Sequence, residues 1–233
     1  MKVVALVPAA GRGVRLGAGM PKALVPVAGE SLLVRAVRGL LDSGRVHHVV
    51  VAAPADQVEV VRRELAGFDP GSVHVVPGGA DRTQSVRLAL ADVDRVAPGA
   101  DVVLVHDAAR AFTPPEMIAD VVDAVLGGAP AVIPVLPVAD TIKQVDPGGA
   151  VTATVDRSLL RTVQTPQGFR PDVLRAAYDA AGDAATDDAG LVERAGGEVR
   201  TVPGHPRALK ITTAFDLAVA ESVLAAEPIG EPR

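Results

Sequence analysis

The chain has 233 residues, of which 48% are hydrophobic but only 2% aromatic, with 23 Lys and Arg against 28 Asp and Glu. The net charge of −5 argues against a general nucleic-acid binder, which needs a basic face, and the lack of cysteine excludes disulfides, thiolate metal sites and a cysteine nucleophile. The sequence has no signal-peptide pattern and no apolar run of about 18 residues, so we expect a soluble cytoplasmic protein that does not bind membranes.

Short apolar runs alternate with amphipathic segments over the first 135 residues. Five runs rich in β-branched residues are predicted strands: 3–7, 49–53, 73–76, 102–105 and 131–135. Four segments are predicted helices: 32–41, 56–65, 83–90 and one that Thr113 caps and Gly127 ends. This alternation predicts an α/β, Rossmann-like open sheet that is twisted and mostly parallel, with helices on both faces.

The alternation breaks at residues 137–164. Residues 139–143 and 150–155 flank a Pro-Gly-Gly turn, which predicts a projecting β-arm. A two-stranded projection is marginally stable alone in water, so we expect this arm to pack on a second subunit in a homodimer.

Beyond the arm, helices are predicted at 171–181, 187–195 and 214–225, and strands near 198–202 and 209–212. We expect residues 1–227 to form a single domain. The Pro- and Gly-containing tail, residues 228–233, is predicted to be disordered.

The loop at 8–22, directly after the first predicted strand, is rich in glycine and basic residues. Its glycines permit close backbone approach to a ligand, and exposed backbone N–H groups can cradle phosphate oxygens. Arg12, Arg15 and Lys22 add three cations, with no acidic residue before Glu30. Long cations opposite a phosphate suit a transition state that gains negative charge, which indicates phosphoryl or nucleotidyl transfer.

Two common phosphate motifs do not fit this loop. The P-loop needs Ser or Thr after a Gly-Lys pair, whereas Lys22 lies between Pro21 and Ala23. The dinucleotide fingerprint needs a glycine where Leu16 stands. A flexible solvated turn stays an alternative for this segment.

Polar loops at 77–82 and 106–110 also follow predicted strands. In open parallel sheets, the carboxyl ends of the strands carry the ligand site. We therefore expect these two loops to converge on the glycine-rich loop.

The residues Pro8-Ala-Ala-Gly-x-Gly-x-Arg15, followed by Pro21-Lys22, resemble the signature of the sugar-nucleotide pyrophosphorylase-type nucleotidyltransferases. Further stretches narrow the resemblance to the 2-C-methyl-D-erythritol 4-phosphate cytidylyltransferase family. These stretches are Gly78-Gly79-x-x-Arg82-x-x-Ser85, His106-Asp-Ala-Ala-Arg110, Asp140-Thr141-Ile-Lys143, Asp156-Arg157, Gln164-Thr165-Pro-Gln167, Thr186-Asp-Asp188 and Lys210-Ile-Thr212.

The resemblance implies a homodimeric, Mg²⁺-dependent cytidylyltransferase of non-mevalonate isoprenoid biosynthesis. The phosphate of methylerythritol phosphate would attack the α-phosphorus of CTP, and pyrophosphate would leave. No covalent enzyme intermediate is implied, so the enzyme would act through positioning and charge neutralisation.

The resemblance also assigns roles to individual residues. The catalytic residues would be Arg15, Lys22 and Lys210, with Asp107 as the metal ligand. The nucleotide would contact Pro8, Ala9, Ala10, Gly11, Gly13, Gly79, Ser85, Asp107 and Ala108. The polyol phosphate would contact Arg110, Thr141, Arg157, Thr165, Thr186 and Lys210, with Thr141 and Arg157 reaching the neighbouring subunit's site.

Several residue assignments stay open in the sequence. Asp107 could cap a turn, and Asp216 could contact the metal or serve the following helix. His106 is interpreted as a hydrogen-bonded residue at a strand end. Ala80 and Ala111 depart from the family's pattern, which leaves base recognition by side chain 80 in doubt.

Other functions also stay open. A cytidylyltransferase acting on ribitol 5-phosphate would share most of these motifs. The glycine-rich loop alone would also allow a nicotinamide-dependent oxidoreductase or a non-catalytic nucleotide sensor, although Leu16 and Lys22 argue against the former.

Overall fold

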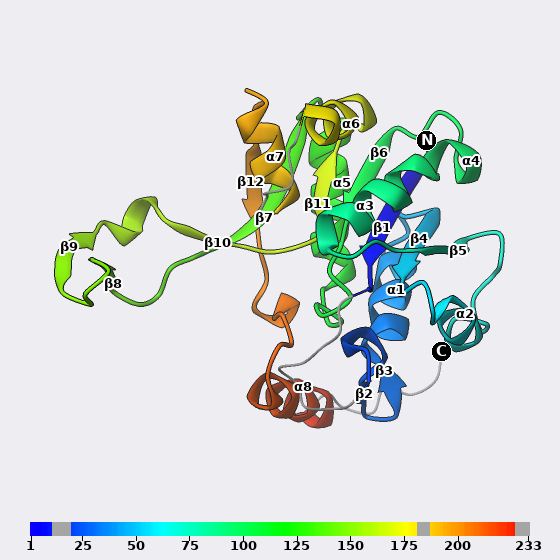
Figure 1. Ribbon diagram of the computed structural model, residues 1–233, viewed down its shortest axis with the longest axis horizontal. Helices are drawn as coiled ribbons and strands as arrows, with labels where there is room; N and C mark the ends of the chain where they lie inside the picture. Colours follow the sequence, from blue (N-terminus) through cyan, green and yellow to red (C-terminus); the bar gives the residue numbers. More distant parts are fainter. Residues whose placement is uncertain (11–19, 181–186, 227–233) are drawn as a thin grey trace.

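The computed structural model describes residues 1–10, 20–180 and 187–226, and its centre is one twisted sheet (Figure 1). The strands follow the order β10-β7-β11-β6-β1-β4-β5, and β12 pairs with β7. Their bounds are β1 Val3–Pro8, β4 His48–Ala53, β5 Val73–Pro77, β6 Val102–Val105, β7 Ala131–Pro137, β10 Arg161–Val163, β11 Gln167–Phe169 and β12 Arg200–Pro203.

The pairing of this sheet is mostly parallel, as predicted. β1 lies between β4 and β6 and is parallel to both, and β5 is parallel to β4. The exceptions are β11, which is antiparallel to both β6 and β7, and β10, which is antiparallel to β7. These two short strands were not predicted, because three residues are too few to show a periodicity.

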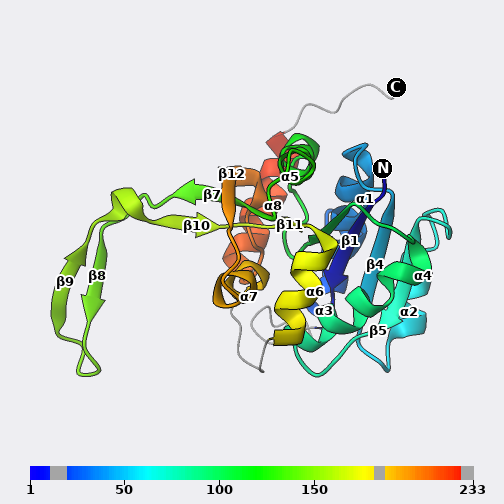
Figure 2. The same cartoon turned by 90° about the horizontal axis from the view of Figure 1, so that it is seen from above.

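Helices cover both faces of the sheet, as predicted (Figures 1 and 2). Alternate residues of β1 divide between two cores, since Val3, Ala5 and Val7 pack in one cluster and Val4 and Leu6 in the other. The first cluster includes side chains of α1 Leu32–Asp42, α2 Val58–Glu64 and α5 Pro115–Leu126. The second includes α3 Arg82–Ala91, α4 Val93–Val96, α6 Pro171–Ala180 and α7 Asp188–Arg194.

A smaller cluster lies under α8 Ala214–Ala226. It packs Val25, Val27 and Leu32 against Ile211 and Ala220. The other elements of this region are η2 Lys22–Leu24, β2 Pro26–Val27, β3 Glu30–Ser31 and η4 Pro206–Ala208. The cluster therefore joins the segment after the first loop to the C-terminal helix.

The predicted arm is present as a hairpin of β8 Ile142–Val145 and β9 Val151–Val155, followed by η3 Arg157–Leu159. It extends far from the sheet (Figures 1 and 2). Most of its residues are exposed, including Leu159, which is 82% exposed. The hairpin shape was thus predicted correctly.

Two local predictions were wrong. Thr113 does not cap α5, because Pro114 occupies the cap position and the Thr113 hydroxyl donates to the carbonyl of Arg110 at 2.9 Å. Residues 209–212 form no strand, because they lead from η4 into α8 beside Ala109 instead of joining the sheet. No helix in the described parts of the chain is long and apolar enough to span a membrane. The predicted disordered tail lies outside the described residues.

Candidate active site

A cleft of about 1030 Å³ opens at the carboxyl edge of the parallel strands. The loops after β1, β5 and β6 all line it, which is the convergence expected from the sheet topology. The predicted site residues in its walls are Pro8, Ala9, Ala10, Lys22, Gly79, Ser85, Asp107, Ala108 and Lys210.

The first wall follows β1. The N–H of Ala9 donates to the carbonyl of Ala52 at 2.8 Å, which holds the loop against the end of β4. Lys22 begins η2 and lies in the same wall. Gly11, Gly13 and Arg15, as well as Arg12, lie outside the described residues.

The loop after β5 forms the second wall. Asp81 caps α3 by accepting from the N–H of Gln84 at 2.7 Å, and the Gln84 side chain in turn accepts from the N–H of Ala80 at 2.7 Å. A Cβ at Gly78 would lie 3.0 Å from the Cβ of Ala10. Glycine at this position therefore lets the first two walls meet closely.

The hydroxyl of Ser85 is used twice inside this loop. It donates to the carbonyl of Asp81 at 2.7 Å and accepts from the N–H of Gly79 at 3.0 Å. Ser85 is fully buried. In this arrangement its hydroxyl shapes the backbone at Gly79.

Asp107, directly after β6, lies between two cations. Its Oδ1 is 3.2 Å from Nε of Arg82, and its Oδ2 is 2.7 Å from Nζ of Lys210. Burial by itself would raise the pKa of Asp107, but these two cations outweigh burial and hold the pKa well below its usual range. The carboxylate is therefore ionised at neutral pH.

Two buried side chains support the backbone at Asp107. Its N–H donates to Oγ1 of Thr165 at 3.0 Å, and the same hydroxyl is 3.1 Å from Nδ1 of His106. Burial lowers the pKa of His106 to about 4, so its ring is neutral at neutral pH. The sequence interpretation of His106 as a hydrogen-bonded strand-end residue agrees with this geometry. Thr165 is 5% exposed and does not line the cleft.

Arg110 lies behind the loop that follows β6. Its guanidinium donates to the carbonyls of Ala208 at 2.6 Å and Val163 at 3.1 Å, so it joins η4 to β10. Its Nε is buried and has no hydrogen-bond partner among the described residues. Burial is the main reason that the pKa of Arg110 is lowered.

Lys210 reaches Asp107 from the C-terminal part of the chain. The N–H of the next residue, Ile211, donates to the carbonyl of Ala109 at 2.8 Å, which fixes this segment beside the loop after β6. Asp216 accepts from the N–H of Thr213 at 2.8 Å while Oγ1 of Thr213 accepts from the N–H of Asp216 at 3.2 Å. This reciprocal pair is a capping box, so Asp216 stabilises the start of α8.

Two predicted polyol-site residues lie on the exposed arm instead of in the cleft. Thr141 precedes β8, and the guanidinium of Arg157 donates to the carbonyl of Ala139 at the base of the hairpin. The arm projects away from the central sheet (Figure 2), and none of its residues lines the cleft. Thr186 lies outside the described residues.

The model of the family described as 2-C-methyl-D-erythritol 4-phosphate cytidylyltransferase matches residues 3–226. The chain belongs to this family. It is 78% identical to the Saccharopolyspora erythraea protein of that name over 97% of this chain and 100% of the relative. It is 59% identical to the Rhodococcus jostii protein of the same name over 95% of each chain.

Solved structures show the same relationship. The synthase of 4-diphosphocytidyl-2C-methyl-D-erythritol from Anaerococcus prevotii has a TM-score of 0.83 at 27% identity, over 96% of this chain and 98% of that one. The 2-C-methyl-D-erythritol 4-phosphate cytidylyltransferase from Thermus thermophilus has a TM-score of 0.76 at 36% identity, over 97% and 100%. The Rossmann-like fold and the nucleotidyltransferase class predicted from the sequence are thus confirmed.

The residues at the cleft are compatible with a divalent cation held partly by phosphate oxygens. Among the described residues, no cluster of three or more His, Asp and Glu side chains could hold a metal without help. Mg²⁺ commonly takes one or two carboxylates and completes its shell with phosphate oxygens and water. Asp107 is ionised, and each of its oxygens accepts only one of the hydrogen bonds described here, so its remaining lone pairs suit such an ion.

One part of the site was not foreseen from the sequence. Arg82 joins Asp107 to the buried Asp188, and the hydroxyl of Tyr178 donates to Asp188 at 2.6 Å. Arg82 and Asp188 belong to two separate motifs of the sequence, and nothing in either motif indicates that they meet. No local pattern could have paired them, because the contact spans 106 positions.

Proposed function

We propose that the chain transfers the cytidylyl group of CTP to 2-C-methyl-D-erythritol 4-phosphate and releases pyrophosphate. The observation that carries this proposal is the meeting of Lys22, Lys210 and Asp107 in one cleft, at the strand edge where parallel sheets bind ligands. Family membership supports the substrate pair, because the relatives described above are named for it.

The chain's own cations would carry most of the catalysis. Lys22 and Lys210 both line the cleft, and their compact charges are suited to neutralising phosphate oxygens as negative charge shifts to the leaving pyrophosphate. Arg15, from the loop outside the described residues, would act with them. Mg²⁺ bound through Asp107 and the triphosphate would supply further charge neutralisation.

Base selection would rest on the backbone of the loop after β5. Hydrogen bonds through Ser85 and Gln84 hold the N–H groups of Gly79 and Ala80, so the loop has a defined shape before a nucleotide arrives. A rigid set of polar groups discriminates well, because a base with a mismatched exocyclic group leaves a partner unpaired. Ala80 takes part through its backbone, which lessens the importance of its departure from the family's pattern.

The polyol phosphate would bind between Lys210 and the rear of the cleft. Arg110 is not among the residues that line the cleft, and it would have to exchange its hydrogen bonds to the carbonyls of Ala208 and Val163 for a phosphate in order to contribute its guanidinium fork. Thr165 and Thr186 would complete this side, Thr165 through a shift of its buried hydroxyl.

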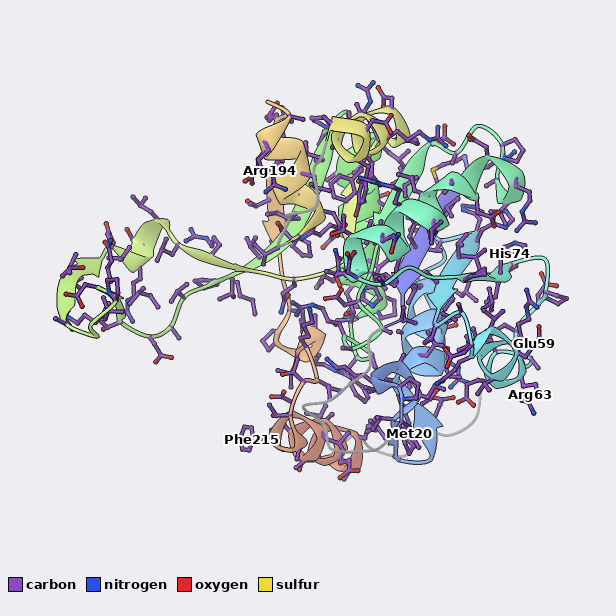
Figure 3. The ribbon with its side chains drawn as sticks, viewed as in Figure 1. Met20, Glu59, Arg63, His74, Arg194 and Phe215 are labelled. Atoms are coloured by element: carbon purple, nitrogen blue, oxygen red, sulfur yellow. The ribbon has the colours of Figure 1, made fainter. Side chains whose placement is uncertain are left out.

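We propose further that the arm completes the site of a second subunit. The arm carries exposed Val145 and Val151 on its hairpin and exposed Leu159 on η3, and an isolated two-stranded ribbon of this kind is marginal in water. Phe215, 76% exposed, projects outward from α8 (Figure 3) and offers another apolar contact for a partner. In such a dimer Thr141 and Arg157 would reach the neighbouring cleft.

Residues 1–227 would then act as one nucleotidyltransferase domain, with 137–164 as its dimerisation arm. A cytoplasmic location would suit an enzyme that consumes CTP.

The test is a pyrophosphate-release assay with four nucleoside triphosphates and two polyol phosphates, in the presence of Mg²⁺. We expect release only with CTP and methylerythritol phosphate. Equal or faster turnover with ribitol 5-phosphate would overturn the substrate assignment. Binding of CTP without any pyrophosphate release would instead indicate a nucleotide sensor.

A further inference from the structure

The guanidinium of Arg82 connects two carboxylates from distant parts of the chain. Its Nε donates to Oδ1 of Asp107 at 3.2 Å. Its Nη1 and Nη2 donate to the two carboxylate oxygens of Asp188 at 3.1 and 2.6 Å. Three of the five guanidinium N–H donors are therefore used in these contacts.

The Asp188 end of this connection is firmly anchored. The Asp188 side chain is 1% exposed, and the hydroxyl of Tyr178 donates to its Oδ1 at 2.6 Å. Asp188 also begins α7, whose first turn is held by Gln167 through the N–H of Ala189 at 2.9 Å. A buried carboxylate requires such partners, and the two-pronged pair with Arg82 fixes the plane of the guanidinium.

The Asp107 end faces the reaction cleft. The contact with Asp188 fixes the plane of the Arg82 guanidinium. The N–H of Arg82 Nε can then point in only one direction, and Asp107 lies in that direction. Lys210 contacts the other oxygen of the same carboxylate at 2.7 Å. The orientation of Asp107, and with it the resting place of the Lys210 ammonium, therefore depends on Arg82.

We propose that Arg82 is a positioning residue for nucleotidyl transfer, which braces against buried Asp188 and holds Asp107 in the orientation the nucleotide needs. This inference rests on the proposed function. Without Arg82, Asp107 could rotate toward Lys210 and pair with it more fully. That pairing would withdraw both the carboxylate and the ammonium from the nucleotide.

The competing interpretation is that Arg82 only neutralises Asp188 and so keeps the protein folded. Removing one partner of a buried pair is strongly destabilising, whereas replacing both by uncharged groups is often neutral. The double variant Arg82→Met/Asp188→Asn is therefore the informative one, beside Arg82→Met and Arg82→Lys. Arg87→Met is the matched control, because Arg87 lies on the same helix and donates to the carbonyl of Tyr178.

Thermal stability, kcat and KM are measured for each variant, and the dissociation constant for CTP is measured without metal or polyol phosphate. We expect the double variant to unfold near the wild-type temperature but to lose about 10- to 100-fold in kcat/KM, the range typical of groups that orient a ligand-binding side chain. Binding of CTP should weaken in the same variant. The kcat/KM of Arg82→Lys should lie between that of the double variant and that of the wild type. The kcat/KM of Arg87→Met should match the wild-type value.

A double-mutant cycle with Asp107→Asn tests the route of the effect. If Arg82 acts through Asp107, adding Arg82→Met to Asp107→Asn should change kcat/KM by less than about threefold, because the two losses are not additive. Multiplicative losses would overturn the inference, as would a double variant Arg82→Met/Asp188→Asn with wild-type kcat/KM. A wild-type protein that releases no pyrophosphate would instead overturn the proposed function.

Discussion

The ammonium of Lys210 lies 2.7 Å from Oδ2 of Asp107, although one residue follows β6 and the other lies just before the C-terminal helix. The pair brings a cation and a carboxylate into the same cleft as Lys22. Opposite charges in one site allow the cleft to hold a triphosphate and its counter-ion together.

Replacing Lys22 or Lys210 by Ala should lower kcat by about 100- to 1,000-fold, the loss typical when a group that stabilises transition-state charge is removed. Initial rates of pyrophosphate release at saturating CTP measure this. The control is Lys2→Ala, since Lys2 contacts Pro98 beyond the amino end of β1 and should be silent. A drop that appears only in KM would contradict a catalytic role.

Mixing two inactive variants tests the arm. Lys22→Ala removes a cleft cation, and Arg157→Ala removes an arm residue. If the arm serves the partner's cleft, each mixed dimer has one intact site, and an equimolar exchanged mixture should recover about a quarter of wild-type activity. If both residues served the cleft of their own chain, no recovery would occur.

Light scattering of Leu159→Asp should show dissociation of the dimer.

Replacing Gly79 by Ala should disturb the loop after β5. The added Cβ would lie 2.4–2.5 Å from side-chain atoms of Gln84, so either the loop or the Gln84 side chain that accepts from Ala80 must move. Misplacement of this size can lower kcat/KM for CTP by up to about 100-fold. The matched control is Gly67→Ala, where an added Cβ meets nothing within 4 Å. Unchanged kinetics for Gly79→Ala would show that the loop tolerates displacement.

His106 should make stability sensitive to mild acid. Its pKa is lowered by burial from 6.5 to about 4, so protonation favours the unfolded chain. Its contribution to the free energy of unfolding is therefore complete above about pH 6.5 and is lost as the pH falls from about 6.5 toward about 4. Urea titrations at several pH values measure this loss. The loss of unfolding free energy between about pH 6.5 and pH 4 should be smaller in His106→Asn than in the wild type. An equal loss in both proteins would show that His106 is not its source.

The sequence alone predicted much of the fold, because the signals concerned are local. The β-branched run before Pro8 predicted β1, and the helical spacing from Leu32 to Leu41 predicted α1, with Ser31 at its N-cap in the structure. Strand alternation then placed the three polar loops at one edge of the sheet. The same reasoning failed for Thr113, because the carbonyl of Arg110 takes its hydroxyl, and for β10 and β11, which are too short to show a period.

Sequence reasoning also placed cations and a carboxylate at that edge, since the order of strands and loops decides which chain segments can meet there. Only the tertiary structure decided which side chains touch. Each oxygen of Asp107 contacts one cation, Arg82 or Lys210, and Arg82 is anchored by Asp188. Arg157 lies in the arm and does not line the cleft. The reason for this difference is the separation of the interacting residues along the chain. Secondary structure depends on neighbours within a few residues, whereas these contacts form only when the packed helices and loops bring distant residues together.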